Sequence, residues 1–454
     1  MDPRRCHFRV TGLNACGALP PDTAMAPEIP PNDPSLRTFI EVDSRSHFPI
    51  QNLPFGIFST HDHPQRRAGV AIGEWILDLA LLETEGLVEV AGDPVFRNPH
   101  LNAFMALGRT ATRAVRQQVS DLLRHDNPGS SSHEALWARA LVPAAEATLH
   151  LPISVRGFTD FMLSREHSMN CVEILGRSRS EGLWPNWHHL PMGYNGRASS
   201  IVVSGAGVHR PSGQVLDPDT GIPRFDPSRK LDFELEAAIV IGKPVPLDQP
   251  ISIAEAEEHV FGMVLLNDWS ARDIQAWESQ PLGPFLGKGF RTSVSPWIVT
   301  LDALEPFRAA GPEQQPPPLS YLRQPGARNF RVHMEASIHP RGERPSVVCR
   351  SRLEDLYWSI AQQVVHHTSA GCNLDTGDLL GCGTVSSAEV GAQGCLYEAT
   401  RDGRAPIALE NGGRRAYLQD YDTVSLRGWC QGEGYRVGFG ECSGCVLPAL
   451  QASG

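Results

Sequence analysis

Acidic residues alternate with apolar ones at the start of KLDFELEAAIVIG, residues 230–242. Successive side chains of a strand point to opposite faces, so Asp232, Glu234 and Glu236 would share one face. The residues that follow, 237–241, are all apolar and predict a strand that is buried on both faces. Carboxylates in a buried place need a cation, because an unpaired buried charge is unfavourable. Two interpretations follow: a site for a divalent metal or an Arg or Lys partner, and a solvated acidic face.

A second segment that could do chemistry is NDWSARDIQAWES, whose pattern predicts a helix. One face of this helix, at spacings i, i+4, i+7 and i+11, would carry Asp268, Arg272, Gln275 and Ser279. Charge pairs at helical spacing also occur on ordinary solvated surfaces, so the spacing leaves both interpretations open. Shortly afterwards Lys288 stands between two glycines, where the missing side chains let another group approach the backbone closely.

Several familiar site motifs are absent from the sequence. The G-x-x-x-x-G-K-[ST] frame of a phosphate-binding loop fails, because Gly289 follows the lysine, and no G-x-S-x-G nucleophile motif occurs. The histidine pairs at 188–189 and 366–367 have no carboxylate at metal spacing, and we expect them to be structural. The single C-x-x-C at 442–445 lacks the second pair that a structural zinc site needs.

Composition limits the class of protein. A chain of 454 residues predicts two or more domains, and a net charge of −11 argues against a nucleic-acid binder, which needs a basic surface to meet phosphates. No apolar run approaches the ~20 residues of a membrane span, and ten cysteines are too sparse for a disulfide scaffold. We therefore expect a cytoplasmic protein without a membrane partner.

The pattern along the chain predicts the elements that must position these residues. Residues 1–35, rich in proline, are expected to form a disordered extension, followed by an N-terminal domain over 36–150 and a catalytic domain over 151–454. Residues 36–42 and 69–79 predict strands, residues 100–125 predict helix, and residues 353–370 predict a helix that ends at Gly371. The glycine-rich segment 430–444 predicts a hairpin rather than a dinucleotide site.

Six segments, taken in order, closely resemble the fumarylacetoacetase family. They are FTDFMLSREHSMN, PNWHHLPMGYNGRASSIVVSG, KLDFELEAAIVIG, HVFGMVLLNDWSARDIQAWE, PLGPFLGKGFRTSVSPW and CQGEGYRVGFGECSGCVLPAL. The resemblance extends from about residue 36 to residue 450. It implies an α+β, mostly β fold, with a small SH3-like barrel N-terminal domain and a large C-terminal domain built as a mixed β-sandwich roll. It also implies a homodimer.

The resemblance assigns roles residue by residue. As metal ligands it implies Asp160, Glu234, Glu236 and Asp268, with Lys288 and Thr292 beside the metal. As catalytic groups it implies His167 as the general base, Glu398 as the acid that orients it, and Arg272, Gln275 and Lys288 as polar stabilisers. As substrate contacts it implies Arg177, Tyr194, Gln275 and Thr384, where Arg177 requires a one-residue insertion.

These residue types suit the chemistry of the family. Four carboxylates are the hard oxygen ligands that Mg²⁺ or Ca²⁺ prefers, and such a cation can chelate both oxygens of a 1,3-diketone. A histidine held by a carboxylate can take a proton from water. The expected reaction is hydrolysis of a carbon–carbon bond in a small diketo acid. The resemblance names this acid as fumarylacetoacetate, which is cleaved to fumarate and acetoacetate in tyrosine and phenylalanine catabolism.

Two departures keep other functions open. Met162 and Ser279 stand where the family has substrate-contacting tyrosines, and each loses a phenol that could recognise a substrate. One alternative is therefore a related acylpyruvate-type hydrolase or a decarboxylase that acts on a different diketo acid. The other is a binding relative without catalysis, which would have no need of His167, Glu398 and the carboxylates together.

Overall fold

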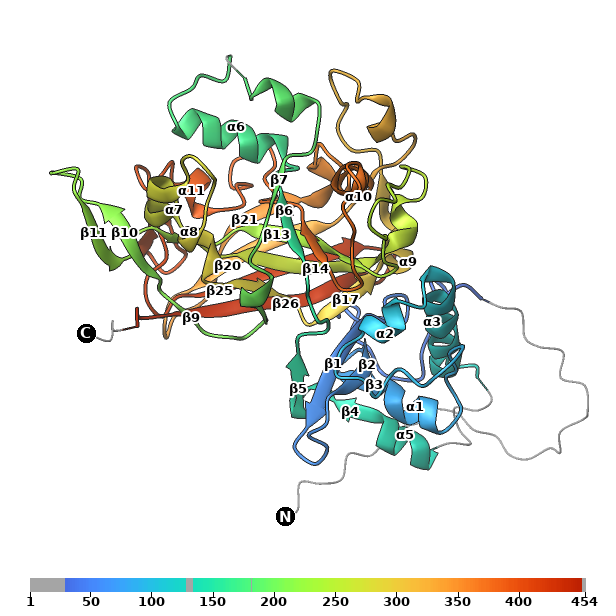
Figure 1. The fold of residues 1–454 in the computed structure, drawn as a ribbon. Helices are drawn as coiled ribbons and strands as arrows, with labels where there is room; N and C mark the ends of the chain where they lie inside the picture. The colour runs from blue at the N-terminus through green and yellow to red at the C-terminus, as the bar shows by residue number, and fades with distance from the viewer. Residues whose placement is uncertain (1–28, 128–133, 181, 451–454) are drawn as a thin grey trace, which may run out of the picture.

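The computed structural model of the protein describes residues 29–127, 134–180 and 182–450. A small N-terminal unit lies beside a larger unit that contains the remainder of the chain (Figure 1). Of the predicted N-terminal extension, residues 1–28 lie outside the described residues. The residues next to them make defined contacts, since Gln117 donates a hydrogen bond to the carbonyl of Ile29 (2.9 Å) and the Asn32 amide donates to the carbonyl of Asp302 (2.6 Å).

The N-terminal unit combines a small antiparallel sheet with short helices. Its elements are β1 (Phe55–Thr60), β2 (Arg67–Ile72), β3 (Trp75–Asp78), β4 (Leu141–Pro143), β5 (Ala147–His150), α1 (Leu79–Thr84), α2 (Asn102–Met105), α3 (Arg109–Leu123) and α5 (Glu134–Ala140). The strand prediction at 69–79 is confirmed by β2 and β3, and the helix prediction at 100–125 by α2 and α3. The strand predicted at 36–42 is wrong, because this segment packs on the end of α3, where Thr38 makes an isolated bridge to Arg124 and Phe39 donates to the carbonyl of Leu123.

The main sheet extends across both units. Its strand order is β4-β3-β2-β1-β17-β14-β13-β22-β6-β7, and β1 joins β17 through the pairs Phe55 with Ile298 and Gly56 with Trp297. In the larger unit these strands are β17 (Trp297–Thr300), β14 (Val260–Asp268), β13 (Leu235–Ile241), β22 (Leu379–Gly381), β6 (Phe158–Phe161) and β7 (Gly193–Asn195). The structure is mostly β with helices, as predicted, and its sheets are open in the strand pairings of the described residues.

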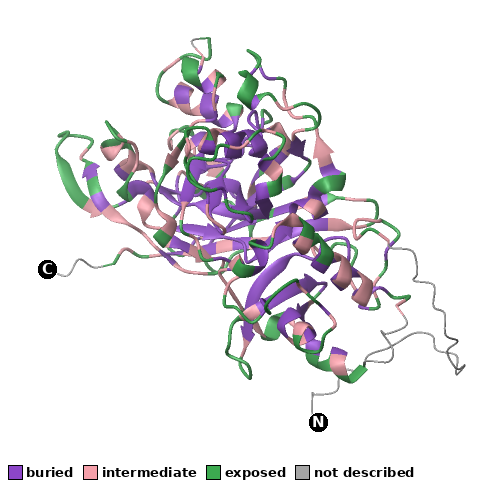
Figure 2. Cartoon of the chain, turned by 45° about the vertical axis from the view of Figure 1, so that its right-hand side comes forward, coloured by how far each residue is buried: buried purple, intermediate pink, exposed green. Residues whose placement is uncertain are grey.

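A second sheet of the larger unit packs against β13 and β14. Its order is β21 (Ser346–Arg352), β20 (His333–His339), β25 (Thr423–Gln431), β26 (Arg436–Leu447) and β9 (Val208–His209). The pair β25 and β26 confirms the predicted C-terminal hairpin. Ala237 and Ile239 of β13 belong to the core that this second sheet shares, whereas Ala238 and Val240 belong to the core of the N-terminal unit. This alternation confirms a strand buried on both faces, and the central strands of Figure 2 are accordingly buried.

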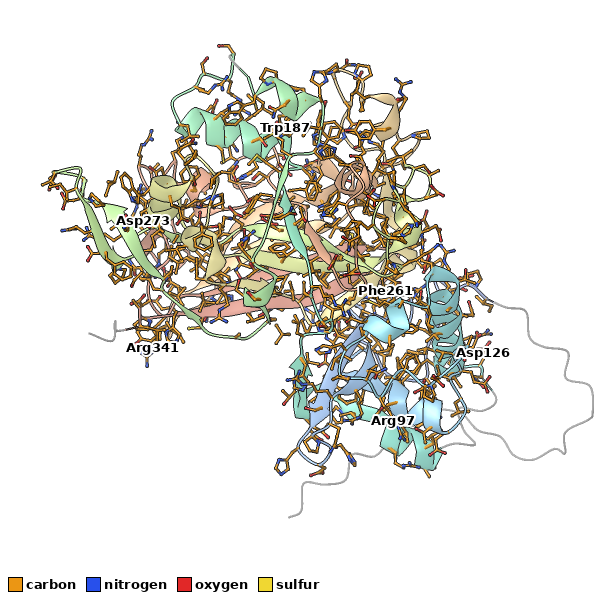
Figure 3. All side chains as sticks on the ribbon, viewed as in Figure 1. Arg97, Asp126, Trp187, Phe261, Asp273 and Arg341 are labelled. Carbon is orange, nitrogen blue, oxygen red and sulfur yellow. The ribbon has the colours of Figure 1, made fainter. Side chains whose placement is uncertain are left out.

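Aromatic side chains fill the junction between the two units. Phe261 of β14, labelled in Figure 3, lies there with its ring centroid 5.8 Å from that of Phe55 and 5.9 Å from that of Phe104. Phe96 extends the group, 5.0 Å from Phe104. Because buried aromatic rings bring large apolar areas together, this cluster fixes the N-terminal unit against the sheet that carries the acidic residues.

The remaining elements surround the sheets. They are α6 (Arg165–Ile174), β8 (Ile201–Val203), β10 (Ser212–Leu216), β11 (Pro223–Pro227), β12 (Leu231–Asp232), β15 (Ser270–Ala271), α7 (Arg272–Glu278), α8 (Leu286–Gly289), β16 (Thr292–Val294), α9 (Leu301–Leu304), β18 (Arg308–Ala309), β19 (Asn329–Phe330), α10 (Ile360–Thr368), α11 (Leu396–Ala399), β23 (Ile407–Ala408) and β24 (Arg414–Arg415). The helix predicted at 353–370 is confirmed over α10, which starts with a capping box at Ser359 and is followed by Gly371 at a φ of 90°. Within the described part of the chain, no helix has both the length and the apolar character needed to cross a membrane.

The helix predicted over 267–279 is wrong in its first part. Asp268 ends β14, where it pairs with Thr292 of β16, and α7 begins only at Arg272. Pairing with β16 gives the backbone of Asp268 its partners, and this tertiary contact overrides the helical pattern. The four residues assigned to one helix face therefore come from a strand end and a separate helix, and their side chains need a different explanation.

Gly262 lies where β14 approaches β17 most closely. A Cβ atom at this position would overlap the backbone carbonyl of Val299 and contact the Ile298 side chain. Because a backbone cannot yield as a side-chain end can, we expect Gly262→Ala to lower the free energy of unfolding by about 1–3 kcal/mol. Urea denaturation checks this, and an unchanged midpoint would show that the two strands have room to separate.

Candidate active site

Four carboxylates meet at one end of the main sheet. Asp160 lies in β6, Glu236 in β13 and Asp268 at the end of β14, while Glu234 lies between β12 and β13. One oxygen of each of these four side chains lies within 4.8 Å of the others, and all four residues are buried. The solvated interpretation of Glu234 and Glu236 is therefore wrong.

Gly381 makes room for this acid cluster, defined as Asp160, Glu234, Glu236 and Asp268. It belongs to β22, which lies between β13 and β6, and a Cβ there would come within 2.7 Å of Asp160 Oδ1 and 3.2 Å of Glu236 Oε2. Glycine thus leaves the space between the two strands to the carboxylate oxygens.

Basic and hydroxyl side chains surround the acid cluster. Lys288 Nζ donates to Glu234 Oε2 (2.5 Å) and to Asp268 Oδ2 (2.7 Å). Arg197 Nη1 lies 2.6 Å from Asp268 Oδ1, and Thr292 Oγ1 donates to the same oxygen at 3.2 Å. On the other side of the cluster the Tyr194 hydroxyl donates to Asp160 Oδ2 at 3.2 Å, and Arg197 Nη2 lies 3.4 Å from that oxygen. The cluster is therefore an ion network that joins five separate segments.

Some oxygens of the cluster remain unpaired. Neither Glu236 oxygen nor Asp160 Oδ1 has a hydrogen-bond partner among the described residues, although all three atoms are buried. Burial and the nearby Asp268 raise the pKa of Asp160 to about 7, and burial and Asp160 raise the pKa of Glu236 well above its usual value. Burial acts in the same direction on Glu234, but Lys288 and Arg272 hold its pKa below the ordinary range.

A hard divalent cation fits this arrangement. Without a cation, burial and mutual repulsion favour the neutral forms of Asp160 and Glu236, and a bound cation would stabilise their charged forms instead; oxygen-only donor sets suit Mg²⁺ and Ca²⁺. The unpaired atoms on Asp160 and Glu236 face the space that Gly381 leaves open. The donor chemistry is therefore compatible with the metal site that the family resemblance implies.

A histidine and a carboxylate form a second buried group. His167, in α6, has its Nδ1 2.7 Å from Glu398 Oε1. Glu398 is itself fixed, because the Ser386 hydroxyl donates to it (2.8 Å to Oε1) and the Asn170 amide donates to its other oxygen (2.8 Å). With Nδ1–H donating to Glu398, the Nε2 atom of His167 is left as the proton acceptor. Burial lowers the pKa of His167, but the neighbouring Cys171 and Glu398 raise it by more, so that it lies well above the ordinary value.

Arg272 connects the acid cluster to neighbouring groups. Its Nη1 lies 2.7 Å from Glu234 Oε1 and donates weakly to Gln275 Oε1 at 3.4 Å, and its Nε donates to Asp232 Oδ2 at 2.9 Å. Its Nη2 atom is buried and has no partner within the described ranges. An unused guanidinium donor beside a buried acid cluster is suited to bind an anionic oxygen of a ligand.

The structure brings most of the predicted site residues together. Those in contact with one another around the cluster are Asp160, Glu234, Glu236, Asp268, Lys288, Thr292, Arg272, Gln275 and Tyr194, with His167 and Glu398 as the adjoining pair. Thr384 is buried with a hydroxyl that lacks a partner among the residues described. Arg177 lies instead over the ring of Trp184, 5.4 Å from its centroid, and within the described residues it has no hydrogen bond or ion pair to the cluster.

Reasoning from the sequence missed two residues of this network. Arg197 pairs with two cluster acids, and Ser386 holds Glu398. Asp232, which the sequence placed among the acids that need a cation when buried, pairs with Arg272. Arg197 has a left-handed φ of 71°, and such strain in a non-glycine residue often marks a functional position, but only the structure shows it. Ser386 has no comparable local signal.

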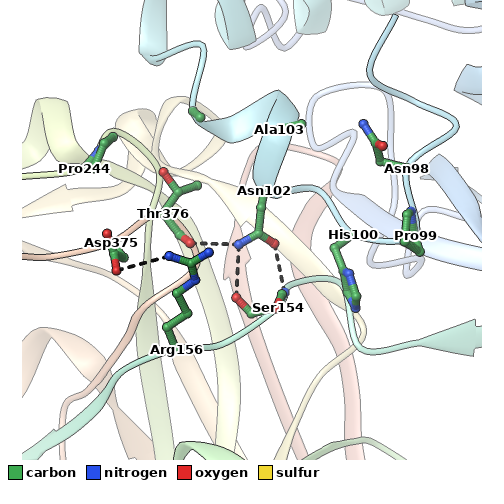
Figure 4. A pocket seen from close by; sticks show the side chains of 11 residues that line it. Asn98, Pro99, His100, Asn102, Ala103, Ser154, Arg156, Pro244, Asp375 and Thr376 are labelled. Carbon is green, nitrogen blue, oxygen red and sulfur yellow. Dashed lines mark hydrogen bonds and ion pairs between the residues drawn. The ribbon is translucent and has the colours of Figure 1, made fainter.

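A separate cavity of about 480 Å³ lies between α2 and the loops at 154–156 and 375–376 (Figure 4). Asn102 forms part of its wall. The side-chain nitrogen of Asn102 donates to the carbonyls of Ser154 (3.0 Å) and Thr376 (2.7 Å), and its side-chain oxygen accepts from the backbone N–H of Ser154 (2.8 Å). Its lining contains none of the cluster acids. This cavity therefore belongs to the junction of the two units and not to the candidate active site.

Comparison with known proteins agrees with this geometry. A family model described as fumarylacetoacetate (FAA) hydrolase C-terminal matches residues 167–447, and one described as fumarylacetoacetase N-terminal matches residues 51–152. The chain belongs to the fumarylacetoacetase family. A fumarylacetoacetase from Oryza sativa subsp. japonica is 47% identical over 422 residues, which cover 91% of this chain and 98% of the relative.

Other relatives in the fumarylacetoacetase family match over the same extent. The fumarylacetoacetase of Homo sapiens is 46% identical over 419 residues, covering 92% of this chain and all (100%) of the relative. Among solved structures, Cg1458 with inhibitor matches at a TM-score of 0.50 with 14% sequence identity, covering 87% of this chain and 100% of the other. At that identity the structural match bears on the fold alone.

Proposed function

We propose that the protein is a metal-dependent hydrolase that cleaves the carbon–carbon bond of fumarylacetoacetate to give fumarate and acetoacetate. The observation that carries this proposal is the acid cluster with its unpaired buried oxygens, which lies beside Arg272 and Lys288 and is accompanied by the His167–Glu398 pair. Relatives that are 46% and 47% identical to this chain, along nearly their whole length, carry the name fumarylacetoacetase. The same groups argue against a binding relative without catalysis, which would need neither a fixed base nor a free guanidinium donor.

In the proposed mechanism the ligands are Asp160, Glu234, Glu236 and Asp268, and a bound Mg²⁺ or Ca²⁺ would polarise the two oxygens of the diketone. Lys288 and Thr292 orient Asp268, and Lys288 also holds Glu234. The cation between these ligands would also relieve the repulsion among the buried carboxylates.

The remaining steps depend on the base His167 and on the basic side chains of Arg272 and Lys288. Glu398 holds the Nδ1–H of His167, so that Nε2 takes a proton from water and the hydroxide attacks the substrate carbonyl. The carbon–carbon bond then breaks and its electron pair moves onto the leaving enolate, whose carbon takes up the proton that His167 removed from water to give acetoacetate. Arg272, through its unpaired Nη2, and Lys288 stabilise this negative charge, while Gln275 supports Arg272.

We further propose Tyr194, Thr384 and Arg177 as substrate contacts. Tyr194 already binds the acid cluster through its hydroxyl, and the Thr384 hydroxyl is buried and unpaired in the part of the chain described. For Arg177 the support is the family resemblance alone, and its guanidinium would have to leave the Trp184 ring to reach the site.

Finer properties belong to the same proposal. We propose a homodimer, since exposed apolar side chains gather on the β10–β11 hairpin and after α7, with Phe225 65% exposed, Leu282 96% and Phe285 73%. An N-terminal domain over 36–150 in the SH3-like barrel class and a catalytic mixed β-sandwich roll over 151–454 accord with the two family models. A cytoplasmic location and a disordered extension over 1–35 complete the proposal.

A single assay tests the reaction and its metal dependence. Purified protein is expected to remove the diketone absorbance of fumarylacetoacetate, to lose nearly all of this activity in excess EDTA, and to regain it with Mg²⁺ or Ca²⁺. An acylpyruvate measured in parallel addresses the alternative that Met162 and Ser279 raise. Turnover of the acylpyruvate without turnover of fumarylacetoacetate would overturn the proposed substrate.

A further inference from the structure

Asp232 is a fully buried carboxylate outside the acid cluster, and it holds the backbone that precedes Glu398. Its Oδ1 accepts the N–H of Leu396 at 2.8 Å, and its Oδ2 accepts the N–H of Tyr397 at 2.9 Å. Leu396, Tyr397 and Glu398 are consecutive residues of the short helix α11. The position of Glu398, and of the His167 ring that it holds, therefore depends on a side chain from β12.

The same carboxylate holds Arg272. Oδ2 of Asp232 accepts the Arg272 Nε–H at 2.9 Å, while Nη1 of that guanidinium lies 2.7 Å from Glu234 Oε1. Two acids that lie two residues apart thus bind two different edges of one planar group. Its third nitrogen, Nη2, is then the donor without a partner among the described residues.

We propose that Asp232 is a positioning residue that sets the Arg272 guanidinium relative to Glu398, so that Nη2 meets the negative charge of the leaving enolate. This inference rests on the proposed function, because it gives Arg272 a role in that reaction. Arg272 contacts Glu234 of the acid cluster, and Glu398 holds the base His167. Asp232 binds both Arg272 and the backbone of α11, the short helix that contains Glu398. It thereby fixes the distance between the base and the charge-stabilising group.

Both oxygens of Asp232 are needed as acceptors. Oδ1 receives the N–H groups of Leu396 and Phe233, and Oδ2 receives those of Tyr397 and Arg272. An asparagine has one acceptor oxygen and one NH₂ group, so either orientation of its amide places a donor against other donors. Asp232→Asn therefore keeps the shape of the side chain and removes the function that we assign to it.

A double-mutant cycle tests whether Asp232 acts through Arg272. Asp232→Asn and Arg272→Lys are each expected to lower kcat for fumarylacetoacetate on the order of 100-fold, the effect of a misplaced catalytic group. The double variant should lose clearly less activity than the product of the two single losses, since the part of the Asp232 effect that acts through Arg272 is already gone, whereas its hold on the backbone before Glu398 is not. Multiplying effects would show that the two residues act independently and would overturn the proposal.

Asp422→Asn is the matched control for general damage. Asp422 is also buried, accepts two hydrogen bonds from Arg415 (2.7 and 2.8 Å) and accepts one from the amide of Gln419 (2.8 Å), but it has no contact with the acid cluster. We expect it to lower the melting temperature as Asp232→Asn does while kcat stays within about twofold of wild type. A comparable loss of kcat in the control would assign the effect of Asp232→Asn to stability and overturn the proposal.

A crystal structure of Asp232→Asn gives a readout that does not depend on activity. We expect the Arg272 guanidinium to leave its present position, with loss of its Nη1 contact to Glu234. An unmoved Arg272 would overturn the positioning role, even if the wild-type enzyme were inactive on fumarylacetoacetate. Such inactivity would instead count against the proposed function, so the two failures are distinguishable.

Discussion

Replacing His167 by alanine is expected to lower kcat for fumarylacetoacetate by about 10²–10⁴-fold, the usual contribution of a general base. The structure supplies the reason: Nδ1 is fixed by Glu398 at 2.7 Å, and Glu398 has its own donors in Ser386 and Asn170. The ring is therefore held in one orientation, and no other imidazole among the described residues contacts Glu398. Steady-state kinetics at saturating Mg²⁺ measures the loss.

Metal affinity separates a catalytic role of His167 from a structural one. His167 makes no contact with Asp160 or Glu236, the acids that carry the unpaired oxygens, so we expect His167→Ala to bind Mg²⁺ within about threefold of wild type by calorimetry. His259→Ala is a matched control, because both histidines are 7% exposed and His259 Nδ1 lies 3.0 Å from the carbonyl of Lys243, away from the cluster. Near-normal turnover by His167→Ala would remove it as the base.

Local patterns in the sequence predicted what depends on local geometry. The period of two in the segment that forms β12 and β13 placed Glu234 and Glu236 on one side, and the structure has them in one cluster. The apolar continuation predicted burial on both faces, which the alternating cores on either side of β13 confirm. Neither pattern could say which cations would meet Glu234, because Lys288 and Arg272 approach it from other segments.

Tertiary contacts decided the features that the sequence predicted wrongly. The pattern of residues 267–279 assigned Asp268 to a helix, with Arg272 on the same face, but the chain around Asp268 pairs with β16, and the ion pairs of Arg272 go to Asp232 and Glu234 instead. The role of Asp232 was likewise out of reach, since its partners Leu396 and Tyr397 lie far along the chain. Contacts between distant segments have no period to detect.

Glu236→Gln tests whether the acid cluster is a metal site, because the substitution should affect the metal-free and the metal-bound protein differently. Both Glu236 oxygens are buried without partners, and Asp160, Glu234 and Asp268 stand close to them. Without a cation, burial and these neighbours disfavour the charged form of Glu236, so replacing its carboxylate by an amide should leave the melting temperature in EDTA unchanged or raise it. When Mg²⁺ is bound, the Glu236 carboxylate would be one of its ligands. Its loss should weaken Mg²⁺ binding at least about tenfold, since even mutations of residues that only support the ligands of a metal site weaken metal binding by that much.

The two effects of Glu236→Gln have opposite signs, which makes the result difficult to explain by general damage. We expect the rise in melting temperature on adding Mg²⁺ to shrink in this variant, as mass action requires when a ligand binds the folded state more weakly. Asp78→Asn provides the comparison, since Asp78 is buried and paired with Arg67 (2.6 Å) in the N-terminal unit, and it should lower the melting temperature with and without Mg²⁺ alike. If Glu236→Gln behaved in the same way, with unchanged affinity for Mg²⁺ and Ca²⁺ by calorimetry, the four carboxylates would be a structural ion network and not a metal site.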